Sequence, residues 1–187
     1  MFNSKNPQLT FVSIDSEQAL IDLGTLHVSR NRTIDISLAV ADQRVDLITC
    51  LVTLHHVPNL DGMLKELARI IRPSGYLIIR EHDCRLERSL GTKYLNFIHA
   101  IMMIARIGEF SYEFVGKPVG FVPWSEEKKK IIQYTKSIEY KTREEWQTKF
   151  QSVGFDLVAT YDYDSSRTGN PQRLFYAMYK RNGKTND

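Results

Sequence analysis

Apolar residues recur with two different periods along the chain, and residues 45–83 show both most clearly. Residues 45–51 (VDLITCL) form a short apolar run, which predicts a strand buried on both faces. Between Asn59 and Pro73, apolar residues recur at helical spacing with charged residues between them, which predicts an amphipathic helix. Residues 76–79 (YLII) form a second apolar run. This order predicts a right-handed βαβ unit in a parallel sheet.

Polar residues gather where these two predicted strands end. His55 and His56 follow the first strand, and Glu81, His82 and Asp83 follow the second. Ligands of open parallel sheets bind beyond the carboxyl ends of the strands. A histidine has a pKa suited to a general base, so the three histidines are candidate catalytic residues. The alternative is that they only pack or line a pocket.

The remaining pattern predicts elements on both sides of this unit. Apolar or alternating runs predict strands over residues 9–14, 33–40, 156–163 and 173–180. Helical spacing, or for the second segment an apolar run of helical length, predicts helices over residues 17–26, 94–107 and 142–154. The third of these helices begins with a capping box formed by Thr142 and Glu145. Strands that alternate with helices indicate an α/β fold.

Length and composition are those of one ordinary globular domain. The chain has 187 residues, 42% hydrophobic and 25% charged, and a net charge of +3, which is too small to indicate a nucleic-acid partner. Its two cysteines are too few for a disulfide framework, and this number is typical of proteins from a reducing compartment. No apolar run reaches the length of a membrane span, and the first residues lack a signal-peptide core. We therefore expect a cytoplasmic protein.

The βαβ unit also carries a resemblance to a known family. VDLITCLVTLHHVPNLDGMLKELARIIRPSGYLIIREHD is similar to the fourth strand, following helix and fifth strand of class I S-adenosylmethionine (SAM)-dependent methyltransferases of the type 11 kind. The resemblance runs from about residue 9 to residue 180. It implies a Rossmann-like, mostly parallel sheet with an antiparallel C-terminal strand. It also implies that residues 9–14 and 33–40 are the family's second and third strands.

The resemblance assigns residues to the cofactor, S-adenosyl-L-methionine. Asp15 matches the acid that binds the ribose hydroxyls, and Asp42 matches the acid that accepts a hydrogen bond from the adenine amino group. Leu51, at the end of the strand over residues 45–51, is assigned to the same site. A carboxylate can accept hydrogen bonds from both ribose hydroxyls, although both acids are also ordinary turn residues.

The family's first strand and its glycine-rich loop, which cradles the methionine part of SAM, have no match in the sequence. Residues 1–8 are too few for that strand and helix, and residues 21–25 (IDLGT) lack the second glycine. We therefore expect weak SAM binding, and a protein partner or a homo-oligomer that completes the domain. The strands over residues 9–14 and 45–51 then either pair directly or leave an apolar edge that favours association.

The predicted function is transfer of a methyl group from SAM to an unknown acceptor. The alternative is a catalytically inactive methyltransferase-like module that binds proteins. Glu81, Asp83 and His99 are the candidate residues of a substrate pocket. We expect cofactor-side βα units over residues 9–83, a helical insertion with a lid over 84–139, and a C-terminal helix and β-hairpin over 140–180.

A metal site is the rival interpretation of the strand ends. His55, His56, His82, Asp83 and Cys84 are all plausible zinc ligands. However, neighbouring residues on an extended chain point in opposite directions, and the sequence contains no CxxC or HExxH spacing. We therefore expect no metal site.

Overall fold

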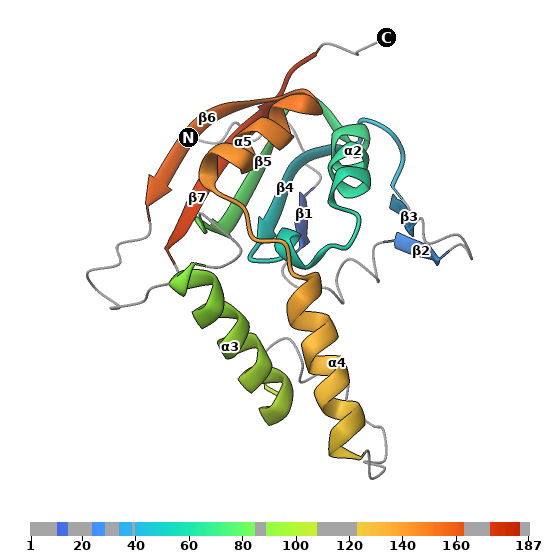
Figure 1. The fold of residues 1–187 in the computed structure, drawn as a ribbon. Coiled ribbons are helices and arrows are strands. Elements are labelled where there is room, and N and C mark those ends of the chain that lie inside the picture. The colour runs from blue at the N-terminus through green and yellow to red at the C-terminus, as the bar shows by residue number, and fades with distance from the viewer. Residues whose placement is uncertain are drawn as a thin grey trace.

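A five-stranded mixed sheet forms the centre of the computed structural model, which describes residues 11–14, 24–28, 34–38, 40–84, 89–107, 123–162 and 173–183. The strand order is β1-β4-β5-β7-β6 (Figure 1). The strands are β1 (Phe11–Ile14), β4 (Val45–Leu51), β5 (Ile71–His82), β7 (Leu174–Arg181) and β6 (Phe155–Asp162). Strands β1, β4 and β5 are parallel, and β7 runs antiparallel to both of its neighbours. The predicted Rossmann-like α/β class, with an antiparallel C-terminal strand, is confirmed.

The first strand of the chain pairs directly with β4. The register runs from Phe11 opposite Leu47 to Ile14 opposite Cys50. Of the two arrangements that the sequence left open, direct pairing is confirmed. The apolar strand β4 lies between β1 and β5 and has no unpaired edge, because its backbone groups are shared with both neighbours.

The segment after β1 differs from the prediction. Strands β2 (Gly24–Val28) and β3 (Ile34–Leu38) form a separate antiparallel pair, so the prediction that residues 33–40 join the parallel sheet is wrong. The helix predicted over residues 17–26 is wrong at its end, since residues 24–26 lie in β2. The alternating residues of β3 pair with β2 as a short two-stranded sheet, which satisfies both backbones locally.

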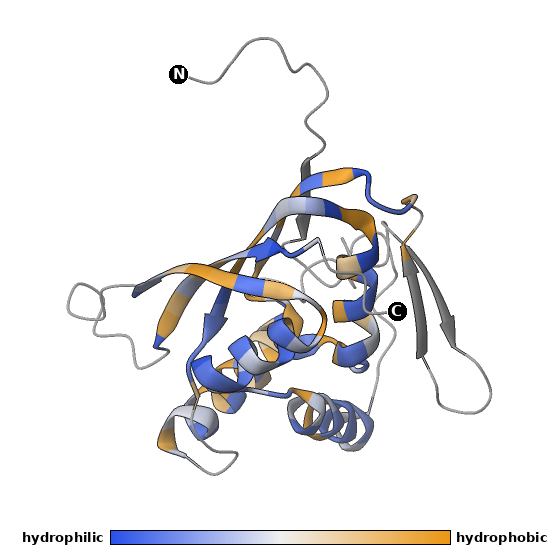
Figure 2. Ribbon diagram, turned by 90° about the horizontal axis from the view of Figure 1, so that it is seen from above, coloured by the Kyte–Doolittle hydropathy of each residue, from blue (hydrophilic) through white to orange (hydrophobic). Residues whose placement is uncertain are grey.

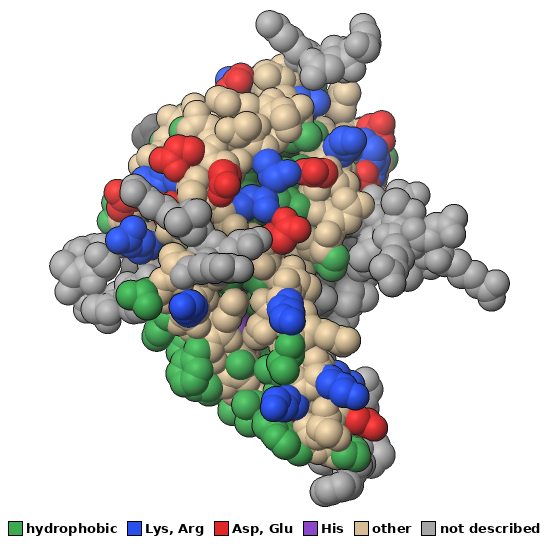
Figure 3. All heavy atoms as spheres, in the orientation of Figure 1, with side chains coloured by type: hydrophobic (Ala, Val, Ile, Leu, Met, Phe, Trp, Pro, Cys, Tyr) green, Lys and Arg blue, Asp and Glu red, His purple; other side chains and the backbone are tan. Residues whose placement is uncertain are grey.

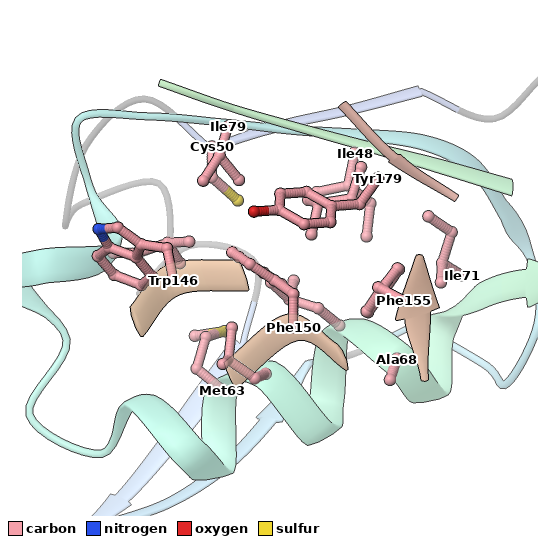
Figure 4. Close-up of a cluster of buried hydrophobic side chains, with 14 of the residues drawn as sticks. Ile48, Cys50, Met63, Ala68, Ile71, Ile79, Trp146, Phe150, Phe155 and Tyr179 are labelled. Carbon is pink, nitrogen blue, oxygen red and sulfur yellow. The ribbon is translucent and has the colours of Figure 1, made fainter. Parts of the chain in front are cut away.

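Two helices cover one face of the main sheet. They are α2 (Leu60–Ile70), capped by the Asn59 side chain, and α5 (Arg143–Ser152), which begins with the predicted capping box. Trp146 and Phe150 of α5 lie between α2 and the sheet, fully buried against Tyr179 (Figure 4). The core therefore fills the space between the strands and these two helices.

The opposite face of the sheet is less covered by the described residues. Along β4, buried Ile48 and Cys50 alternate with half-buried Leu47 and Thr49. Figure 2 shows that both hydrophobic and hydrophilic residues occur along β4 and β5. The prediction that β4 is buried on both faces is therefore wrong, because α2 and α5 both pack on the same side.

Strand β5 contains an irregularity near Ser74 and Gly75. The register steps from Val45 opposite Ile71 to Leu47 opposite Tyr76, so β5 carries extra residues here. A Cβ atom on Gly75 would lie 2.9 Å from the Arg72 carbonyl oxygen, which only glycine avoids.

Beyond the carboxyl ends of β4 and β5 lie a short 3-10 helix, η1 (Leu54–His56), and two longer helices, α3 (Leu90–Ala105) and α4 (Trp124–Ser137) (Figure 1). Helix α3 buries Leu95 and His99 but exposes apolar side chains, including Phe97 and Ile104. None of the helices in the described ranges is long and apolar enough to cross a membrane. Most of the predicted lid, residues 108–122, lies outside the described residues.

Two charged residues of α2 fasten the end of β3 to the domain. The Glu66 carboxylate, almost fully buried, accepts a hydrogen bond from the Leu38 backbone N–H at 2.6 Å. Arg69 pairs with Glu66 and donates to the carbonyl oxygens of Leu38 and Val40. This network compensates for burial of a charged side chain, because every charged group in it has a partner.

We predict that Glu66→Ala lowers the free energy of unfolding by roughly 1–3 kcal/mol, since the buried Leu38 N–H loses its acceptor. Urea denaturation followed by circular dichroism measures the change. The matched control is Lys65→Ala at the neighbouring, exposed position, where we expect a change within about 0.5 kcal/mol. Equal stability of the two variants would contradict the prediction.

Candidate functional site

The chain makes a strained turn at the carboxyl end of β4. Val52 has a φ of 58°, which is rare for a β-branched residue and costs roughly 1–3 kcal/mol. Its backbone N–H donates to the Arg80 carbonyl oxygen at 2.7 Å, so the turn stays joined to β5. The chain then enters η1, which carries His55 and His56.

A buried carboxylate on β5 holds this turn in place. Glu81 Oε1 accepts the backbone N–H groups of Leu54, at 2.8 Å, and Thr53, at 3.2 Å. Its other oxygen, Oε2, accepts Nδ1–H of His55 at 2.6 Å. Both side chains of this pair are at most 1% exposed. Glu81 therefore stabilises the backbone conformation at the start of η1 and the orientation of the His55 ring.

Four of the chain's five histidines meet at this point, and we call them the histidine cluster: His55, His56, His82 and His99. The ring centroids of His55 and His56 are 3.9 Å apart, and His55 lies 5.3 Å from His82. His99, from α3, lies 5.0 Å from His56. The structure thus brings together the three predicted catalytic histidines and one predicted pocket residue.

Two tyrosines complete the cluster. Tyr134 of α4 places its hydroxyl 2.9 Å from Nδ1 of His56. The Tyr140 hydroxyl lies 3.0 Å from Nδ1 of His99, which also contacts the Leu95 carbonyl oxygen at 2.8 Å. Sequence reasoning missed both tyrosines. Tyr134 is 78 residues from His56, and neither tyrosine stands in a motif that indicates this site.

Burial favours the uncharged form of three of these histidines, His55, His56 and His99. It lowers the pKa of His55 to about 3, helped by the nearby His99, and it also lowers the pKa values of His56 and His99. Burial raises the pKa of Glu81 to about 7, although His82 and the backbone N–H groups oppose this rise. In the hydrogen bond between them, the neutral imidazole of His55 therefore donates its Nδ1–H to Glu81.

The other predicted site residues lie away from the histidine cluster or accept hydrogen bonds from backbone N–H groups. Asp42 is exposed and pairs with Arg69, close to the amino end of β4 and away from the cluster. The Asp83 carboxylate accepts the backbone N–H of Arg143, the first residue of α5. Leu51 is half-buried at the carboxyl end of β4. Asp15 lies outside the described residues.

The cluster also has the composition of a metal site. Within the described part of the chain, His55, His56 and His99 offer ligand atoms that all lie within 4.8 Å of one another. The expectation that adjacent His55 and His56 point apart is wrong, because they lie on a 3-10 turn rather than on an extended strand. Nitrogen ligands of this kind suit zinc and related divalent ions.

The histidine cluster predicts a loss of stability in acid. Below pH 6.5, the ordinary histidine pKa, the unfolded chain binds protons at His55, His56 and His99 that the folded chain does not bind. Glu81 acts in the opposite direction between about pH 7 and 4.5, but it is one group against three. The free energy of unfolding therefore falls as the pH is lowered from 6.5 to 4.5.

Urea denaturation between pH 4.5 and 8, with a chelator present, measures this dependence. His99→Gln removes one of the three groups whose pKa burial lowers, so we expect a shallower slope in that variant. Equal slopes for His99→Gln and the unaltered chain would contradict the argument.

Comparison with known proteins connects this geometry to a family. The model of a methyltransferase domain matches residues 3–79. A ubiquinone biosynthesis O-methyltransferase of Alkalilimnicola ehrlichii is 24% identical over 170 residues, which cover 84% of this chain and 66% of that protein. Its counterpart in Coxiella burnetii is 32% identical over 93 residues, covering 44% of this chain and 40% of that protein. The chain thus spans less than two thirds of the length of either relative.

The fold has a match among solved structures. A methyltransferase-like protein of Bacillus halodurans superimposes with a TM-score of 0.50 at 11% identity, covering 94% of this chain and 93% of that one. Sequence over residues 3–79 and fold over most of the chain agree. The predicted resemblance to class I SAM-dependent methyltransferases is confirmed, and SAM is the cofactor that this relationship indicates.

Proposed function

We propose that this chain, a relative of the class I SAM-dependent methyltransferases, transfers a methyl group from SAM to an oxygen atom held at the histidine cluster. One observation carries the proposal. The methyltransferase-domain match over residues 3–79 includes His55 and His56, and the buried cluster to which they belong lies at the carboxyl ends of β4 and β5. Open α/β sheets bind their ligands at that edge. The relatives from Alkalilimnicola ehrlichii and Coxiella burnetii are both O-methyltransferases, which supports an oxygen acceptor.

The residues present fit one part of SAM. Half-buried Leu51, at the carboxyl end of β4, suits a contact with adenosine. In the sequence, Asp15 directly follows Ile14, the last residue of β1, and the family resemblance assigns it to the ribose. The 187 residues contain no glycine-rich loop that fits the methionine part. The fit therefore supports binding of SAM through its nucleoside, with low affinity.

SAM supplies an electrophilic methyl group, and the chain's own residues hold the acceptor. Because Glu81 accepts Nδ1–H of His55, Nε2 is the ring nitrogen that can accept a hydrogen bond from an acceptor hydroxyl. His56, beside it on η1, forms a second polar contact, and His82 forms the neighbouring wall. Aligning the acceptor oxygen and excluding water are the main contributions that a protein makes to such a transfer.

The space between α3 and α4 is the proposed route of the acceptor to the cluster. Histidine surface shows between α3 and α4 in the space-filling view, next to apolar side chains of α3 (Figure 3). Phe97 and Ile101 of α3 are both more than 40% exposed. An acceptor with an apolar body and one hydroxyl would match this entrance, since apolar surface surrounds a buried polar group.

The test is formation of S-adenosylhomocysteine that depends on an acceptor. We expect it when the chain is incubated with about 1 mM SAM, well above a Kd in the micromolar range or weaker, and a panel of hydroxylated aromatic compounds. Mass spectrometry measures the product, and samples without an acceptor are the control. His55→Gln should slow turnover by roughly 100-fold or more. Bound SAM in calorimetry without turnover on any acceptor would contradict the proposal.

We also predict that Asp15→Ala weakens SAM binding. Charge-assisted hydrogen bonds to the ribose contribute roughly 1.5–3 kcal/mol, so calorimetry should show a Kd about 10- to 150-fold higher. Asp42→Ala is the matched variant, and we expect a smaller change there because Asp42 pairs with Arg69 away from the cluster. An unchanged Kd in folded Asp15→Ala would mean that Asp15 is only a turn residue.

A further inference from the structure

We propose that His55, His56 and His99 bind a divalent transition-metal ion of the zinc class at the carboxyl ends of β4 and β5. Their ligand atoms lie within 4.8 Å of one another, and they come from two elements, η1 and α3, that are far apart in the sequence. Three histidines are the ligand set of a zinc site that keeps its fourth position open. This site is new relative to the strand-end residues considered from sequence, because His99 replaces His82, Asp83 and Cys84.

Each of the three rings is already oriented by a protein oxygen at Nδ1. Glu81 holds His55, the Tyr134 hydroxyl holds His56, and the Leu95 carbonyl holds His99. Metal-binding histidines generally use one ring nitrogen for the ion and donate the other N–H to a carboxylate, carbonyl or similar group. The arrangement thus presents Nε2 of each ring as the ligand atom.

The most direct indication comes from His55. Its Nε2 is buried and has no hydrogen-bond partner among the described residues. A polar atom in that state costs free energy unless something binds it. The ring is held by the 2.6 Å contact with Glu81, so it cannot turn to find water without breaking that bond. A metal ion at Nε2 satisfies the atom and uses the carboxylate–histidine pair as it stands.

The geometry needs only a small closure. Zinc binds histidine nitrogens at about 2.0–2.1 Å, which places tetrahedral ligands about 3.4 Å apart. No pair of ligand atoms therefore has to approach by more than about 1.4 Å from its present spacing. Rotation of His99 and His56 about their side-chain bonds supplies such movement, because they belong to separate elements and face each other with ring centroids 5.0 Å apart.

The open fourth position gives the site a role that rests on the proposed function. An acceptor hydroxyl bound there would have a lowered pKa and would lose its proton to solvent. The oxygen lone pair would then form the O–CH3 bond while the sulfonium C–S bond breaks, leaving S-adenosylhomocysteine and a metal-bound ether. The ion would hold the acceptor oxygen in place of the direct hydrogen bond to His55.

The experiment is titration of the chelator-treated full chain with Co2+, followed by displacement with Zn2+, without SAM or acceptor. We expect one ion per chain and the visible absorption bands of a four-coordinate cobalt site. His55→Gln and His99→Gln should each weaken binding by at least 100-fold, and Glu81→Gln by 10- to 100-fold. His82→Gln is the matched control, since His82 lies in the same cluster but outside the three ligands, and it should bind as the unaltered chain does.

Circular dichroism confirms that each variant is folded. If His55→Gln does not fold, His99→Gln on α3 still tests whether the three histidines bind the ion. Absence of stoichiometric binding at micromolar Co2+, or equal binding by the His55, His99 and His82 variants, would overturn the proposal. Metal binding without turnover would leave the site standing and refute the proposed function. Turnover in a chain that binds no metal would refute the metal site and support the proposed function.

Discussion

The geometry of the site depends on one buried carboxylate. Glu81, at the end of β5, accepts three hydrogen bonds from the turn after β4, two from backbone N–H groups and one from the His55 ring. These bonds help to compensate for the strained φ of Val52, and they orient the His55 ring. The sheet brings the carboxylate there because β4 and β5 are adjacent and parallel, so their carboxyl ends meet. Topology, strain and ring orientation are therefore linked through a single side chain.

Direct pairing of β1 with β4 explains how the chain forms a continuous sheet from the segment that resembles the methyltransferase family. In the resembled family another strand separates these two, and here the register Phe11 to Leu47 brings them together. The backbone groups of β4 are then satisfied on both sides, and its end is fixed against β5, where η1 begins. The same rearrangement separates β2 and β3 from the main sheet, and Glu66 and Arg69 hold the end of β3 against α2 instead.

The sequence predicted those features that depend on local pattern. The period of apolar residues located β4, α2 and β5, and the capping box located the start of α5. Placement of His55, His56 and His82 at one edge followed from parallel topology alone. The contributions of His99, Tyr134 and Tyr140 could not be predicted, because they depend on how α3 and α4 pack across that edge. The antiparallel pairing of β2 with β3 was missed because a short alternating segment fits either kind of sheet.

Packing alone is a poor explanation for the histidine cluster. Four imidazoles and a carboxylate in one buried site hold several polar nitrogens away from water, and burial there lowers the pKa of His55 to about 3. Apolar residues of similar volume would fill the same space without desolvating polar groups, as the core around Trp146 and Phe150 does on the covered face of the sheet. Natural sequences place residues that are unfavourable for local packing mainly at functional sites. The composition of the carboxyl edge of β4 and β5 therefore fits the proposed chemistry better than it fits a role in packing alone.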